Sequence, residues 1–125
     1  MTECTVMPPS PAPPHAVAVL VLPGVVPFDL TLACEVFGRA EHAPGRPCYA
    51  VTVCGEQATF DTGRFTLGVK HGLAATKRAQ TLVVPGTEDP DTPISPAVRR
   101  APVAAAARGA RIASICTGAF AVAQA

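Results

Sequence analysis

The chain has 125 residues, which suits one domain with a single hydrophobic core. Its hydrophobic content of 49% and charged content of 15% exclude a chain that is disordered throughout. The formal net charge is +1, and no Lys/Arg group exceeds the pairs Lys77-Arg78 and Arg99-Arg100. These counts therefore predict no nucleic-acid-binding surface.

The five cysteines, at positions 4, 34, 48, 54 and 116, form neither a CxxC pair nor a Cys/His spacing typical of zinc. An odd number of cysteines without a disulfide framework indicates a reducing compartment, so we expect a cytoplasmic protein. The carboxylates of the loop 87–93 are interleaved with prolines, as in ordinary acidic loops. We expect no metal and no cofactor.

The first fourteen residues lack the pattern of any secondary-structure element. They contain five prolines, which disfavour a helix, and no basic segment of the kind that opens a signal peptide. We expect a disordered, Pro-rich tail at 1–14, followed by one domain over 15–125. The apolar run from Ala16 stops at Pro23-Gly24, too early to span a bilayer, so we expect no membrane partner.

The first half of the domain alternates strand and helix patterns. Residues 16–22 are continuously apolar with valine at alternate positions, which is typical of a parallel strand covered on both faces. Apolar residues then recur every three or four positions over 30–39, which predicts an amphipathic helix. Residues 41–47 are predicted to form a Pro/Gly loop, and 49–54 a second strand.

The second half continues the alternation. A turn signal at 61–63 predicts a small hairpin or excursion over 59–69, and a short helical turn is expected at 73–78. Residues 81–84 read as a buried strand that stops at Pro85-Gly86.

The last helix and strand before the end of the chain have clear boundary signals. Ser95 is an expected N-cap for a helix over 97–108, kinked or divided at Pro102, and Gly109 is its expected C-cap. A strand at 111–115 follows. The whole order predicts an α/β fold with a mainly parallel sheet and helices on both of its faces.

The last fifteen residues, RIASICTGAFAVAQA, compress a strand, a sharp turn and the start of a helix. Cys116 at the turn and Gly118 after it have the layout of a nucleophile elbow, and a sulfur at a helix start faces N–H groups that favour thiolate. These residues alone fit a small buried hydrophobe at Cys116 equally well. Cys116, Pro85-Gly86 and Pro23-Gly24 all end strands, where parallel sheets bind ligands.

Three segments resemble the DJ-1/PfpI superfamily, a class I glutamine amidotransferase-like fold of flavodoxin type. They are VLVLPGVVPFDLTLACEVFGRA, TLVVPGTEDP and ARGARIASICTGAF, and they span nearly the whole chain after the tail. The subgroup that the chain resembles most is the N-terminal domain of AraC-type transcriptional regulators. The resemblance implies a flavodoxin-like three-layer sandwich.

The resemblance also implies roles for single positions. Cys116 matches the reactive cysteine of the elbow, and Asp29 matches the acid on the first helix whose carboxyl approaches that sulfur in many members. Gly86 and Thr87 match a loop that offers a backbone N–H to an oxyanion, with the N–H of Thr117 as second donor.

Other titratable residues have simpler interpretations. By its position alone Asp29 would be a helix N-terminal acid, but the resemblance favours the role beside Cys116. Glu35, the acid of EVF, is expected to be structural. His42 and His71 are expected to be solvent-exposed rather than catalytic bases, and Cys34 and Cys54 to be core residues.

Two functions from different classes remain open, beside the third possibility of a flavodoxin-like domain that has no surviving activity. The favoured one is a small-molecule-sensing domain of an AraC-family regulator, which contacts DNA only through a C-terminal domain missing from this chain. Regulators of this fold dimerise, so a homodimer is also implied. The alternative is a cysteine-dependent enzyme of the superfamily, namely a hydratase, a glyoxalase-type lyase or an amidase. There Cys116 would act on the substrate and Asp29 would hold or exchange its proton.

The sequence departs from the family pattern at its C-terminal side. The histidine that many enzymes of the superfamily carry after the elbow helix, and the helix-turn-helix domain of the AraC-type relatives, have no counterpart here. We therefore expect a C-terminally truncated domain, with an uncovered apolar face that favours self-association.

Overall fold

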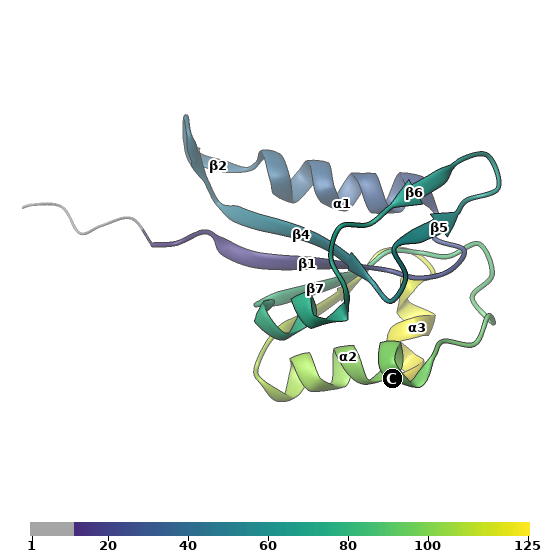
Figure 1. Cartoon of the computed structure of the whole chain (residues 1–125). Helices are drawn as coiled ribbons and strands as arrows, with labels where there is room; N and C mark the ends of the chain where they lie inside the picture. Colours follow the sequence, from purple (N-terminus) through teal and green to yellow (C-terminus); the bar gives the residue numbers. More distant parts are fainter. Residues whose placement is uncertain (1–11) are drawn as a thin grey trace, which may run out of the picture.

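A four-stranded sheet forms the centre of the structure, a computed structural model that describes residues 12–125 (Figure 1). Its strands are β1 (His15–Val21), β4 (Tyr49–Gly55), β7 (Thr81–Val84) and β8 (Arg111–Ser114). Their order is β4-β1-β7-β8 and every neighbouring pair is parallel, which confirms the predicted sheet. The predicted tail at 1–14 lies almost wholly outside the described residues.

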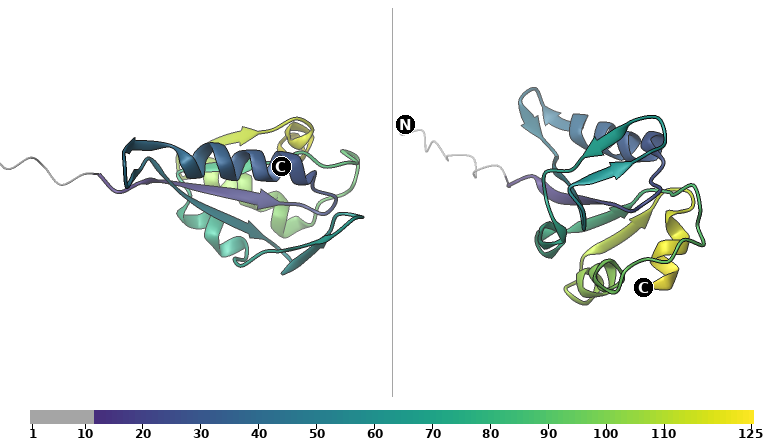
Figure 2. Two further views of the ribbon diagram at one scale, coloured as in Figure 1. Left: turned by 90° about the horizontal axis from the view of Figure 1, so that it is seen from above. Right: turned by 45° about the vertical axis from the view of Figure 1, so that its right-hand side comes forward.

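Helices cover both faces of this sheet (Figures 1 and 2). On one face lies α1 (Pro27–Arg39), and on the other lie η1 (Leu73–Arg78), α2 (Pro96–Ala107) and α3 (Gly118–Gln124). The alternation in β1 explains the two layers, because successive side chains of a strand point to opposite faces. Its valines pack with α1, whereas Ala18 and Leu20 pack with α2 and η1.

Two small hairpins extend from the layers. The first, β5 (Thr59–Asp61) with β6 (Thr66–Gly68), is the predicted hairpin, and Asp61 Oδ1 accepts a hydrogen bond from the Gly63 N–H at 2.7 Å in its turn. The second pairs β2 (Glu41–Ala43) with β3 (Arg46–Pro47), where the sequence predicted only a loop. That prediction was wrong because Gly45, at a φ of 77°, lets the chain fold back.

The helix boundaries mostly follow their sequence signals. The Ser95 hydroxyl accepts a hydrogen bond from the Val98 N–H at 3.2 Å, which confirms the N-cap, and Gly109 has a φ of 87° after the helix. Two expectations need correction. Helix α2 is not divided at Pro102, which is buried inside it, and α1 begins three residues early because Pro27 suits a first helical position.

Candidate functional site

The site is determined by where the chain leaves the sheet. Strands β1 and β7 are parallel neighbours, and after them the chain leaves to opposite faces, α1 on one and α2 on the other. In α/β proteins such a topological switch point is where ligands bind, beyond the carboxyl ends of the strands, and we call this region of the molecule the crevice. The two loops that line it are joined by hydrogen bonds, from the Val26 N–H to the Gly86 carbonyl and from the Glu88 N–H to the Gly24 carbonyl, each at 2.9 Å.

Asp29 is a buried acid at this crevice. It lies in the first turn of α1 and is 8% exposed. Its Oδ2 has no hydrogen-bond partner among the described residues, although an unpaired buried carboxyl oxygen is costly. A β-carbon on Gly86 would come within 2.5 Å of this oxygen, so Gly86 is what allows the loop after β7 to approach the acid. The structure thus brings Asp29 and Gly86 together.

Thr117 and Thr87 form a reciprocal contact. The Thr117 hydroxyl accepts a hydrogen bond from the Thr87 N–H at 2.9 Å and donates one to the Thr87 carbonyl at 2.8 Å. The Thr87 N–H that was expected to serve an oxyanion is therefore bonded to a side chain in this structure. The contact ties the turn after β8 to the loop after β7.

Cys116 occupies the turn itself. Its φ of 51° makes it the one non-glycine residue of the described chain in the left-handed region, a conformation that costs about 1–3 kcal/mol and gathers at functional sites. The residue is exposed, which excludes the alternative of a buried hydrophobe. The Gly118 N–H closes the turn on the Ile115 carbonyl at 2.9 Å.

Sequence reasoning missed the role of Gly118 as a contact point. A β-carbon there would lie 2.1 Å from the Val84 carbonyl oxygen, so only glycine lets α3 start directly against the end of β7. The signal was present, because a glycine two residues after Cys116 is where such a close approach is required.

The remaining candidates lie away from Cys116. His42 and His71 are exposed, as predicted; His71 is bridged to Cys54 of β4, and β1 and β7 lie between β4 and β8. Cys54 is fully buried, and burial raises its pKa to about 11. In the described part of the chain, no three His, Cys, Asp or Glu side chains form a group suited to a metal ion. None of its helices is long and apolar enough to cross a membrane.

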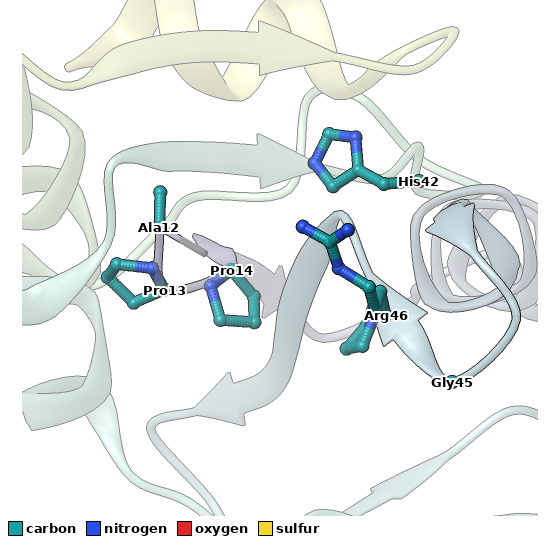
Figure 3. A pocket seen from close by; sticks show the side chains of 7 residues that line it. Ala12, Pro13, Pro14, His42, Gly45 and Arg46 are labelled. Carbon is teal, nitrogen blue, oxygen red and sulfur yellow. The ribbon is translucent and has the colours of Figure 1, made fainter. Parts of the chain in front are cut away.

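A cavity of about 490 Å³ lies at the other end of the sheet (Figure 3). His42 and Arg46 of the β2–β3 hairpin line one side of it, and residues 12–14 line the other. It opens beside the amino end of β1, whereas Asp29 follows the carboxyl end of that strand. The cavity is therefore separate from the crevice.

Comparisons with known proteins agree with this architecture. No protein-family model matches the chain. The uncharacterized protein in the cpoL 5′ region of Streptomyces lividans is 33% identical over 110 residues, which are 87% of this chain and 78% of that protein.

Solved structures of several proteins share the fold. Drosophila melanogaster DJ-1beta has a TM-score of 0.71 and 20% identity, over 89% of this chain and 60% of its own. An AraC family transcriptional regulator from Pseudomonas putida has a TM-score of 0.67 and 22% identity, over 87% of this chain and 60% of its own. The chain thus spans about 60% of the length of either structure, and such identities show the fold alone.

Proposed function

Since this chain belongs to one family with the Streptomyces lividans protein and has the fold of the DJ-1/ThiJ/PfpI-like proteins, we propose that it is a small-molecule-sensing domain. In this proposal the complete protein is an AraC-family transcriptional regulator, and a separate segment contacts DNA. The regulator from Pseudomonas putida among the structural neighbours supports this class.

The contact between Thr117 and Thr87 is the observation that carries the proposal. A hydrolytic or acyl-transfer site needs N–H groups aimed at the place where an oxyanion develops. Here the Thr87 N–H is bonded to the Thr117 hydroxyl instead. A ligand oxygen that accepts from Thr87 would displace this hydroxyl and separate the turn after Cys116 from the loop after β7. The same contact that disfavours catalysis thus gives a route from ligand binding at the loop to the turn after β8.

The placement of the histidines supports the same proposal. A cysteine nucleophile is usually activated by a base within hydrogen-bond reach. Of the three histidines, His15 and His42 lie at the amino end of the sheet and His71 lies beside β4. The nucleophile elbow at Cys116 would then serve as a ligand contact.

A second candidate is the cysteine-dependent enzyme. The observation in its favour is that Cys116 is exposed and held in a strained conformation, next to the residue whose hydroxyl contacts the crevice loop. In that case Cys116 would attack the substrate and Asp29 would hold or exchange the proton.

Two measurements separate these candidates. Reading the gene downstream of codon 125 should reveal a helix-turn-helix segment if the protein is a regulator, whereas a short segment with a His-containing strand would favour the enzyme. The complete protein should also leave a metabolite extract chemically unchanged. The sensor proposal would be overturned if the wild type converts a metabolite and the Cys116→Ala variant does not.

A further inference from the structure

Four cationic side chains from distant parts of the sequence line one groove at the amino ends of β7 and β8. We call it the basic groove and define it by Lys77, Arg78, Arg108 and Arg111. Lys77 and Arg78 end η1, Arg108 follows α2, and Arg111 opens β8 beside Thr81. The amino end of β1 and the last turn of α2 lie on this side of the molecule, at the left of Figure 1.

No described carboxylate neutralises these cations. The single ion pair among the described residues joins Arg39 to Glu35 on α1. The acidic residues that follow β4 and β7 lie at the opposite, carboxyl ends of the strands, and they are Glu56, Glu88, Asp89 and Asp91. Four of the ten Lys and Arg residues thus gather in the basic groove, and within the described part of the chain none of the four forms an ion pair.

Helix dipoles explain only part of this arrangement. Cations are favoured at helix C-termini, which accounts for Lys77, Arg78 and Arg108. Arg111 begins a strand and gains nothing from a dipole. Arg108 is also held in place, because its Nη2 donates to the Thr76 carbonyl at 2.7 Å and its other donors remain available to a ligand.

We propose that the basic groove binds an oligophosphate anion, either free or as the phosphate chain of a nucleotide. The guanidinium groups of the three arginines can bind phosphate oxygens through paired N–H donors. Together with Lys77 they supply four positive charges, which balance a tri- or tetra-anion. The groove is an open depression of about 450 Å³, a volume within the range of small-molecule sites. Its lining contains no Phe, Tyr or Trp on which the bases of single-stranded nucleic acid would stack.

The site is independent of the crevice at Asp29, because it lies at the other end of the strands. A ligand here would also contact Gln80, which is already fixed by the hydrogen bond from the Ala16 N–H to its Oε1 at 2.8 Å. The fold therefore positions the Gln80 side chain before any ligand arrives.

The test is a calorimetric titration of the full chain with sodium tripolyphosphate at low and physiological salt. We expect saturable binding that weakens with salt, and about tenfold weaker binding in Arg78→Gln and in Arg111→Gln, since each loses a hydrogen bond to a charged group. Arg111→Lys should fall between the wild type and Arg111→Gln. Arg64→Gln, an exposed arginine on the β5–β6 turn, is the matched control and should bind normally.

Titrations with ATP and with a short DNA duplex identify the ligand class. ATP that binds more tightly than tripolyphosphate would support a nucleotide, and equal affinities would support a free oligophosphate. The proposal is overturned by absent binding in a folded wild type, or by an equal loss in Arg64→Gln. It is also overturned if a short DNA duplex binds more tightly than tripolyphosphate and the same two arginines are needed.

Discussion

Asp29 and Gly86 lie so close that a β-carbon on the glycine would sit 2.5 Å from the Asp29 Oδ2. The same added carbon would lie 2.9 Å from the Thr117 Oγ1. One position without a side chain therefore lets three segments meet, the first turn of α1, the loop after β7 and the turn after β8. The geometry of the crevice depends on this glycine.

Replacing Gly86 with alanine should destabilise the protein. The added carbon forces Asp29 or the loop to move, and such overpacking costs about 1–3 kcal/mol in the free energy of unfolding. Urea denaturation measures the loss. Gly38→Ala is the control, because a β-carbon at Gly38 meets nothing within 4 Å and Gly38 lies in α1, so stability should stay level or rise. Equal losses in the two variants would contradict the account.

Replacing Thr117 with valine should separate the turn after Cys116 from the crevice loop. Valine keeps the shape of threonine but leaves the Thr87 N–H and carbonyl without their partner, at a cost of about 1–3 kcal/mol. Hydrogen exchange of the Thr87 amide should accelerate, while Thr117→Ser, which keeps the hydroxyl, should stay near the wild type. Unchanged exchange in Thr117→Val would show that the contact contributes nothing in solution.

Cys116 should be the first of the four described cysteines to be alkylated. It is the exposed one, whereas Cys34 and Cys48 are half-buried and Cys54 is fully buried. Burial and then the Glu35 carboxylate also raise the pKa of Cys34, which reduces its thiolate fraction. Mass spectrometry of partially alkylated protein gives the order. Earlier labelling of Cys34 or Cys48 would contradict this prediction, and Cys116→Ser identifies the corresponding peptide.

The buried thiol of Cys54 should make the free energy of unfolding fall at alkaline pH. Burial raises the pKa of its thiol from the ordinary 9.0 to about 11. Between these values the unfolded chain has lost the proton that the folded chain retains, so the free energy of unfolding falls as the pH rises. The stabilisation that the protonated Cys54 thiol gives to the folded state is fully present below pH 9.0 and is lost by about pH 11. Denaturation of the wild type and of Cys54→Ala across this window should show a steeper decline in the wild type.

The sequence predicted the strands and helices of the main sheet and its two faces well, because the residue patterns that define them are local. The alternation in β1, the Ser95 cap and the glycine after α2 each determine the backbone within a few residues. The sequence did not predict the β2–β3 hairpin, because its short strands carry no alternating apolar pattern. Local chemistry is thus sufficient for the strands and helices of the main layers but not for short hairpins that lack an apolar pattern.

The site was only partly predictable. Asp29 and Cys116 could be proposed from the resemblance to a family, but the bond from the Thr87 N–H to Thr117 joins residues 30 positions apart. The basic groove was invisible in the sequence, because its cations come in short groups that only the sheet register brings side by side. Contacts of this kind depend on the tertiary structure alone.

The basic groove and the acidic loop after β7 lie at opposite ends of the strands, so their charges contribute a dipole along the strand direction although the net charge is only +1. Two copies at low ionic strength should therefore attract end to end, with the arginine-rich pole of one facing the acidic pole of the next. The attraction should vanish when the Debye length shrinks to about 10 Å at 0.1 M salt. Light scattering would report this as a second virial coefficient that changes from negative to positive on adding salt.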